Sequence, residues 1–511
     1  MPVEPPQTRI RMPSSSLVLF IQDTGGRVRR QAAEATGPTG SASTAHPIAT
    51  EAALAVLAEG GSAVDAAIAA HLVLAVVAPQ ATGVGGDLLA LVHSGDEVVA
   101  FGGTGLTPAS MPVDTTAAGA TVTVPGFLAA CADMHRMFGR LPWERLFEMP
   151  IALADGGIHV DGPLHDAAEE QRSRLQPFAS SYALLGLAPG DLWRQPELAA
   201  LLRSVSIRGA RAFYEESGGG IASAVASAGG AMQPSDLIGH ETMIGSPISS
   251  TAEGIALSVQ PAPTQGVLLA MAFRWIEGHR DLLSEGNLDH LLVEATGAAF
   301  EFRDDAFRGA GLLDEPLAVS LDRATRRDGP RAYLHTAGVA TADADGLVVS
   351  SLSSVFDDFG SAVLVPELGI VLNNRAEGFT AGANSYRPGA RPVHTLAPAM
   401  VETADGVMAI ATPGADGQVQ TLLAILTRHL LLGMPLADAV SRPRWRSQSG
   451  DVLVERSFPE GEQAGLIARG HRVVVRPDGI DAFGAVVAAG SREGTTWSLA
   501  DWRRQTETGA V

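Results

Sequence analysis

The stretch that decides the fold runs from Leu334 to Thr380 and reads LHTAGVATADADGLVVSSLSSVFDDFGSAVLVPELGIVLNNRAEGFT. Thr336 begins a short alternating segment that ends in Asp343-Ala344-Asp345-Gly346. An Asp-Gly pair between two apolar segments is a strong hairpin signal, and Leu347-Val348-Val349 supplies the second segment. The stretch therefore predicts a strand, a tight turn and a second strand, with Thr336 at the start of the hairpin.

Composition limits the kinds of partner that the chain can bind. A formal net charge of −20 over 511 residues gives no reason to propose a nucleic acid or an anionic membrane, because those surfaces attract clustered positive charge. The sequence holds no lysine, which excludes Schiff-base chemistry and a P-loop lysine. The single cysteine, Cys131, cannot form an intramolecular disulfide, and we interpret it as a small core residue.

The order of segments along the chain indicates the fold class. Residues 1–44 are rich in Pro, Ser, Thr and Gly and predict a flexible N-terminal arm. The apolar run Leu17–Ile21 is too short for a signal peptide or a membrane span, so we expect a cytoplasmic protein. Leu88–Phe101 predicts a hairpin, Thr121–Val124 a strand, and the chain from Phe127 to about Gly311 mostly helix. Long helices between hairpins favour an α+β fold over a doubly wound parallel sheet.

Motifs at fixed distances from Thr336 carry a resemblance to a known family. Phe359-Gly360-Ser361 and Leu372-Asn373-Asn374 follow the Asp343–Gly346 turn without a gap in register. With them, the chain resembles the gamma-glutamyltranspeptidase family of N-terminal-nucleophile hydrolases. The resemblance implies a four-layer αββα N-terminal-nucleophile hydrolase sandwich, made as one chain that cuts itself before Thr336. It also implies a large-subunit region over residues 45–335 and a small-subunit region over 336–511, which together form one interwoven domain.

The chemistry that this resemblance implies has a physical rationale. A threonine hydroxyl is a weak nucleophile near neutral pH and needs a base within reach, and the α-amine of an N-terminal threonine, with a pKa of about 7.7–8.0, can be that base. The resemblance assigns Thr336 as the nucleophile and Ser354 as the hydroxyl that assists it. The neighbouring Ser353 is the structural alternative to Ser354, that is, a serine with no part in catalysis. Gly414-Ala415 matches the family's Gly-Gly turn, whose backbone N–H groups stabilise the oxyanion.

The segments that would bind substrate depart from the glutamyl-specific pattern. Phe101–Pro108 has no charged residue where those members hold the substrate carboxylate with an arginine. We assign substrate binding to Arg375, Glu377, His394 and Thr395, which resemble the oxamate amidohydrolase-like branch. In the cleft, Arg375 could hold a small carboxylate or carbonyl group. The alternatives are a surface arginine on a loop and, for His394, a structural hydrogen bond.

These features favour an amidohydrolase or acyltransferase that cleaves a small-molecule amide through an acyl-enzyme and passes the acyl group to water or an amine acceptor. No cofactor and no metal are predicted, and the sequence contains no Gly-x-Ser-x-Gly or His-Glu-x-x-His motif. Ala337 and Gly338 replace the family's second threonine and its histidine or tyrosine. An uncleaved, weak or inactive paralogue that acts as a binding or scaffold protein, for example in a biosynthetic pathway, is therefore the alternative.

Overall fold

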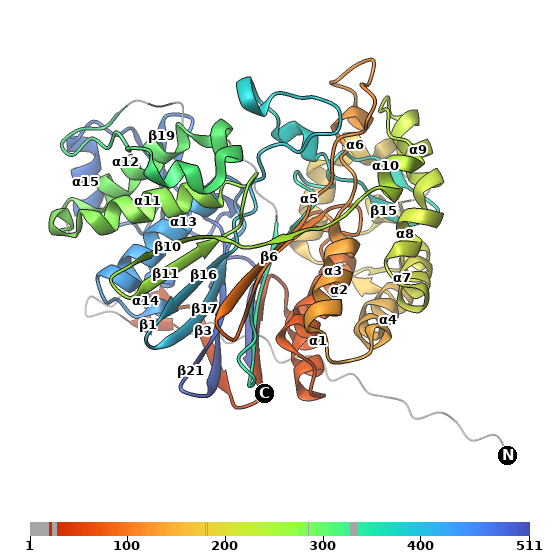
Figure 1. Cartoon of the computed structure of the whole chain (residues 1–511), viewed down its shortest axis with the longest axis horizontal. Helices are drawn as coiled ribbons and strands as arrows, with labels where there is room; N and C mark the ends of the chain where they lie inside the picture. Colours follow the sequence, from red (N-terminus) through yellow and green to blue (C-terminus); the bar gives the residue numbers. More distant parts are fainter. Residues whose placement is uncertain are drawn as a thin grey trace.

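Two seven-stranded antiparallel sheets form the centre of the molecule (Figure 1). The computed structural model describes residues 20–22, 28–178, 180, 182–284, 286–325, 327 and 336–511. We name the sheets after one strand of each. The β17 sheet has the strand order β10 (Ile248–Ala252), β11 (Ile255–Val259), β16 (Ala399–Thr403), β17 (Gly406–Ala411), β21 (Val487–Arg492), β22 (Thr495–Ala500) and β3 (Ala33–Gly37). The β12 sheet has the order β23 (Glu507–Ala510), β4 (Gly40–Thr44), β12 (Ala337–Asp343), β13 (Val348–Ser354), β5 (Asp87–Ser94), β6 (Glu97–Gly103) and β9 (Met243–Gly245).

The hairpin predicted after Thr336 is confirmed as β12 and β13, which lie in the middle of their sheet. The Asp343 carboxylate holds the turn because Oδ1 accepts hydrogen bonds from the backbone N–H of Asp345 at 2.9 Å and of Leu347 at 3.1 Å. Its Oδ2 accepts from the backbone N–H of Ala63, the first residue of helix α2, at 2.8 Å. One carboxylate therefore fixes both the turn and the helix beside it.

Helices cover the outer face of each sheet (Figure 1), and buried apolar side chains fill the space between the sheets. The inter-sheet cluster includes Leu89, Leu352, Met400 and Val487. The helices beside the β12 sheet are α1 (Pro47–Ala58), α2 (Ala63–Val77) and α3 (Phe127–Phe138), with α4 (Glu148–Gly156), α5 (Gly162–Glu170), α6 (Arg172–Leu175), α7 (Pro196–Arg208), α8 (Arg211–Glu216), α9 (Gly218–Ser227) and α10 (Pro234–Ile238) further out. On the β17 sheet lie α11 (Gly266–Gly278), α12 (Leu288–Phe300) and α13 (Gly417–Leu426), together with α14 (Leu436–Ser441) and α15 (Glu460–Ala468). The predicted α+β class is confirmed.

Short strand pairs complete the fold: β1 (Phe20–Gln22) with β2 (Val28–Arg30), β7 (Ile158–His159) with β8 (Leu192–Trp193), β14 (Leu364–Val365) with β15 (Ile370–Val371), and the three-stranded set β18 (Trp445–Gln448), β19 (Asp451–Glu455) and β20 (Val473–Arg476). The predicted strand over Thr121–Val124 is wrong. Its backbone N–H groups bond elsewhere: Thr123 donates to Asn373 Oδ1 at 3.1 Å and Val124 to the Leu106 carbonyl at 3.0 Å.

The predicted flexible arm over residues 1–44 is wrong for residues 33–44, while residues 1–19 and 23–27 lie outside the described residues. Strands β3 and β4 lie in the two large sheets, and all five residues of β4 are buried between β12 and β23. The small residues there reflect close packing rather than disorder, because a Cβ on Gly40 would lie 2.8 Å from a methyl group of Leu57 in α1. A run of Gly, Ser and Ala can indicate either situation, and only the three-dimensional context separates them.

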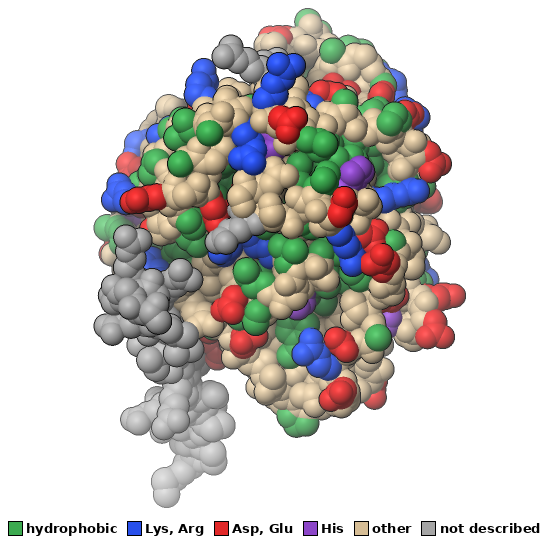
Figure 2. All heavy atoms as spheres, turned by 90° about the vertical axis from the view of Figure 1, so that its left-hand side faces the viewer, with side chains coloured by type: hydrophobic (Ala, Val, Ile, Leu, Met, Phe, Trp, Pro, Cys, Tyr) green, Lys and Arg blue, Asp and Glu red, His purple; other side chains and the backbone are tan. Residues whose placement is uncertain are grey.

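The surface agrees with the composition. Figure 2 shows arginine and acidic side chains interspersed over the face that carries α12 and α15, without a broad area of one sign. No helix among the described residues is long and apolar enough to cross a membrane.

Cys131 is buried in α3, where burial raises the pKa of its thiol, which fits a core residue.

Candidate active site

Thr336 lies immediately before the first residue of β12, beside Ser354, which is the last residue of β13. Its hydroxyl donates to Ser354 Oγ at 3.4 Å, and Ser354 Oγ also accepts the backbone N–H of Phe356 at 2.9 Å. The hydroxyl contact is longer than the usual range of about 2.5–3.0 Å, as is common for sites without substrate. His335, on the other side of the predicted cleavage point, lies outside the described residues.

The structure separates the two neighbouring serines. Successive side chains of a strand point to opposite faces, and here Ser354 points towards Thr336 while Ser353 points towards α2. Ser353 Oγ lies 2.9 Å from His71 Nδ1 and accepts the hydroxyl of Thr82 at 2.7 Å. Ser353 therefore belongs to a buried polar network, and the geometry favours Ser354 as the partner of Thr336.

Gly414 and Ala415 form a tight turn between β17 and α13. Their φ angles are 127° and 48°, so Ala415 holds a left-handed conformation that favours glycine. Among the described residues, neither backbone N–H donates a hydrogen bond. Pro413, the preceding residue, lines the same cavity as Thr336. The turn thus offers two donors near the predicted nucleophile.

Arg375 is fully buried, so its interpretation as a surface arginine is wrong. Its Nε donates to Asp87 Oδ2 at 2.7 Å, and its guanidinium lies over the ring of Phe356 at 4.6 Å from the centroid. Nη1 and Nη2 are buried and have no hydrogen-bond partner among the described residues. Burial lowers the pKa of Arg375, and Asp87 opposes this shift. Two donor nitrogens of a buried cation therefore have no partner among the described residues, and such a pair suits an anion.

Asp87 joins Arg375 to His394. Burial alone would raise the pKa of Asp87, but Arg375 and His394 bring it below its ordinary value. His394 Nδ1 accepts the backbone N–H of Leu396 at 3.1 Å, so Nε2 carries the proton that is donated to Asp87 Oδ2 at 3.2 Å. Burial, assisted by the Arg375 charge, lowers the pKa of His394 to about 4. His394 is thus a neutral donor that helps to hold Asp87.

The other two predicted substrate residues, Thr395 and Glu377, differ in burial. Thr395 is buried, and its carbonyl accepts a hydrogen bond from Gln265 Nε2, which also donates to the Ala415 carbonyl at 2.9 Å. Gln265 therefore joins the loop of Thr395 to the turn at Gly414. Glu377 lies exposed on a short 3₁₀ helix, Arg375–Gly378, and the structure does not bring it into the Arg375–Asp87 cluster.

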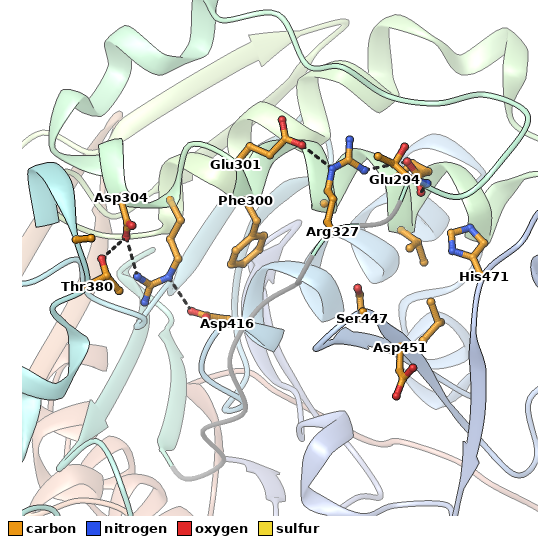
Figure 3. A pocket seen from close by; sticks show the side chains of 17 residues that line it. Glu294, Phe300, Glu301, Asp304, Arg327, Thr380, Asp416, Ser447, Asp451 and His471 are labelled. Carbon is orange, nitrogen blue, oxygen red and sulfur yellow. Dashed lines mark hydrogen bonds and ion pairs between the residues drawn. The ribbon is translucent and has the colours of Figure 1, made fainter.

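Two cavities lie near these residues. One of about 340 Å³ is lined by Thr336, His46, Pro413 and Arg504 among others. A larger one of about 530 Å³ is lined by Asp416, which directly follows Ala415, and by Asp304 and Thr380 (Figure 3). The predicted nucleophile and the larger cavity thus lie on different sides of the Gly414–Ala415 turn.

Comparison with known proteins identifies the family. The family model described as Gamma-glutamyltranspeptidase matches residues 49–511. The chain belongs to this family. It is 34% identical to the oxamate amidohydrolase proenzyme of Klebsiella pneumoniae subsp. pneumoniae, over 87% of this chain and 93% of that protein. It is 31% identical to the glutathione hydrolase-like YwrD proenzyme of Bacillus subtilis, over 78% and 83%. The crystal structure of cephalosporin acylase from Bacillus halodurans superposes with a TM-score of 0.83 at 27% identity, covering 96% of this chain and 99% of that one.

Membership of the gamma-glutamyltranspeptidase family confirms the resemblance recognised in the sequence. The higher identity to oxamate amidohydrolase than to the glutathione hydrolase-like protein confirms the predicted branch. The superposition also confirms that the two large sheets share the fold of an acylase of known structure.

Two residues of the site were missed in the sequence. Asp87 follows Gly83-Val84-Gly85-Gly86 and begins a strand of buried apolar residues, so a charge at that position was a usable signal. Gln265 lies at the start of α11 and gave no such signal. It was missed because its partners are backbone carbonyls far away in the sequence.

Proposed function

We propose that the protein is an amidohydrolase or acyltransferase that cuts its own chain before Thr336. The Thr336 hydroxyl would attack the carbonyl of residue 335, and water would hydrolyse the resulting ester to leave a free α-amine on Thr336. Support comes from the contact of Thr336 with Ser354 and from the proenzyme names of the relatives. The products would be a large fragment ending at His335 and a small fragment beginning at Thr336.

Turnover would reuse the same hydroxyl. The α-amine of Thr336 accepts the hydroxyl proton as Oγ1 attacks the amide carbon, and the backbone N–H groups of Gly414 and Ala415 donate to the oxyanion. The carbon–nitrogen bond then breaks, and the leaving nitrogen takes the proton from the ammonium group. An acyl ester remains on Oγ1, and water or an amine acceptor removes the acyl group by the same steps.

The proposed substrate is a small amide that carries a carboxylate, as oxamate does. The observation that carries this proposal is the buried Arg375, whose Nη1 and Nη2 have no partner among the described residues. A short chain of contacts connects Arg375 to Thr336. The guanidinium of Arg375 packs on the ring of Phe356, and the backbone N–H of Phe356 donates to Ser354, which contacts Thr336. His394 donates a hydrogen bond to Asp87, the partner of Arg375, and the carbonyl of Thr395 accepts one from Gln265.

The first test is self-processing. A denaturing gel of the purified protein should give bands of roughly 35 and 18 kDa, and N-terminal sequencing of the smaller one should begin with Thr336. Thr336→Ala should abolish both cleavage and activity, and Thr336→Ser should retain some of each. A cleaved Thr336→Ala protein would disprove the assignment of Thr336.

The second test is substrate choice. We expect oxamate and similar short amides to be hydrolysed faster than γ-glutamyl anilides, measured as kcat/KM on the same preparation. Fast glutamyl turnover would contradict the interpretation that the uncharged stretch Phe101–Pro108 lacks the arginine that glutamyl-specific members use.

The alternative, an uncleaved protein that acts by binding, is based on Ala337 and Gly338, which replace the family's second threonine and its histidine or tyrosine. A Cβ on Gly338 would lie 3.0 Å from a methyl group of Val487, so this position has little space for the larger side chain. A single persistent band near 52.8 kDa, with no turnover of any amide, would support this alternative.

Three further parts of the proposal concern the layers of the fold, the domain organisation and the cellular location. The layers form the four-layer αββα sandwich of N-terminal-nucleophile hydrolases, which the inter-sheet cluster and the outer helices support. Each of the two large sheets contains strands from before and from after residue 336, which supports one interwoven domain. We also propose a cytoplasmic location, which fractionation of cells expressing the full chain would test.

A further inference from the structure

A second cluster of chemically capable side chains lies away from Thr336. His290 and Glu294 stand one turn apart on the same face of α12, and His471 lies in the loop before β20. All three residues are buried, and one ligand-type atom from each falls within 4.8 Å of the others. The cluster lies at the end of the larger cavity, which Glu294 and His471 both line (Figure 3).

The two histidines face each other nitrogen to nitrogen. His290 Nδ1 lies 2.8 Å from His471 Nε2. Two nitrogens that bind one tetrahedral ion at about 2.0–2.1 Å are about 3.3 Å apart, so the pair needs to open by only about 0.5 Å. At this distance one ring donates a hydrogen bond to the other, and an ion between the two nitrogens would replace the shared proton.

The remaining nitrogen of His290 suits the same arrangement. Nε2 is buried and makes no hydrogen bond of standard geometry among the described residues, although the backbone of Ser320 and Leu321 lies beside the ring. A ligand histidine in a metal site usually directs its second N–H at a backbone carbonyl or a carboxylate. An ion on Nδ1 would fix the tautomer with the proton on Nε2, facing that backbone.

Glu294 would be the third ligand, and Arg327 is the competing cation. Glu294 Oε2 accepts from Arg327 Nη1 at 2.9 Å, and Oε1 accepts the backbone N–H of Thr325 at 2.9 Å. Figure 3 shows Glu294 between Arg327 and His471. Each carboxylate oxygen retains a second lone pair, so Glu294 can bind an ion while it keeps both contacts. Arg327 is also held by Glu301, at 2.7 Å, which offsets its charge.

We propose that His290, Glu294 and His471 bind one divalent transition-metal ion of the Zn²⁺ type, with water from the larger cavity in the fourth position. Two imidazoles and a carboxylate are a ligand set that suits Zn²⁺, and the cavity provides an entry path. The ion would join α12 to the loop before β20. If the chain is cut before Thr336, as proposed above, it would also connect the two fragments. Among the described residues, none lines both this cavity and that of Thr336.

Metal binding is tested on the purified full chain. Equilibrium dialysis against Zn²⁺ with elemental analysis should give one ion per chain, and Co²⁺ should give the visible absorption of a tetrahedral site. His290→Gln and His471→Gln should each weaken binding by more than about 100-fold, since loss of an outer-shell partner alone costs about 10–100-fold. His159→Gln is the control, because His159 is exposed and lies in β7, which pairs with β8 and not with an element that carries the cluster.

Arg327→Gln provides a test in the opposite direction. It removes the competing charge and leaves all three ligands, so Zn²⁺ should bind at least several-fold more tightly. Thr336→Ala should still bind one ion, which separates a failure of this proposal from a failure of the proposed hydrolase. No ion bound by the wild type and Arg327→Gln, or equal binding by wild type, His290→Gln and His471→Gln, would overturn the proposal.

Discussion

Removing one partner of the buried Arg375–Asp87 pair should destabilise the protein and remove the carboxylate recognition proposed for Arg375. Both side chains are 0% exposed, so Arg375→Met leaves Asp87 as an uncompensated buried charge. Such single removals cost about 3–5 kcal/mol. Unfolding entropies of about 2.1 cal/mol/K per residue convert this loss, over 511 residues, into a fall of about 3–5 °C in Tm.

The double variant Arg375→Met with Asp87→Asn separates stability from recognition. It removes both charges, and the introduced amide would keep an oxygen for the Nε2–H of His394. We expect most of the lost Tm to return, because replacing both partners of a buried pair is often nearly neutral. Carboxylate recognition should stay lost, since hydrogen bonds to charged groups contribute about 1.5–3 kcal/mol, which is about 10- to 150-fold in kcat/KM.

The assay compares two substrates on each variant. Thermal unfolding gives Tm, and the ratio of kcat/KM for oxamate to that for a neutral amide of the same size gives recognition. A double variant that keeps the wild-type ratio would show that Arg375 is only structural. A single Arg375→Met variant with unchanged Tm would refute the argument from the buried charge.

Three further predictions concern local structure and pH. Ala415→Gly should raise Tm by about 1 °C. It relieves a left-handed conformation that costs alanine about 1–2 kcal/mol, and glycine's backbone entropy offsets part of this gain. A lower Tm would contradict this prediction. Asp343→Ala should lower Tm by about 3 °C through loss of three backbone hydrogen bonds, and Asp343→Asn should lower it less. Burial lowers the pKa of His71 from 6.5 to about 3, so the unfolded state takes up the proton first and stability falls as pH drops below 6.5. Between pH 6.5 and 5 this group should remove about 2 kcal/mol from the free energy of unfolding, and His71→Gln should lack that part of the pH dependence in urea titrations.

The local pattern around Thr336 was predictable because its signals are local. The Asp343–Gly346 turn and the apolar segments beside it depend on neighbouring residues, and they formed β12 and β13 as expected. The family motifs extended this information to Ser354 and to the Gly414–Ala415 turn. What sequence reasoning could not give was which face of a strand each serine would occupy, since that depends on whether α2 or Thr336 lies opposite.

The substrate region was less predictable because its contacts connect distant segments. Arg375 and Asp87 are 288 positions apart, and neither spacing nor composition links them. Arg375 was considered as either a cleft or a surface residue, and the partner that makes it a buried cation was not recognised. The flexible arm was a different kind of error, because small residues in β4 were interpreted as disorder although they allow α1 to approach the sheet.

The position of Thr336 explains how a chain could be cut there and keep its fold. Strand β12 pairs with β13 from Ala337 and with β4 from Val339, so both ladders begin after the proposed cleavage point. A break before Thr336 would therefore remove no hydrogen bond from either ladder. The large-fragment strand β5 also pairs with the small-fragment strand β13 along seven residues, from Val348 to Ser354. The sheet would thus hold the two fragments together, and the new α-amine would lie at the edge of a strand whose position is already fixed.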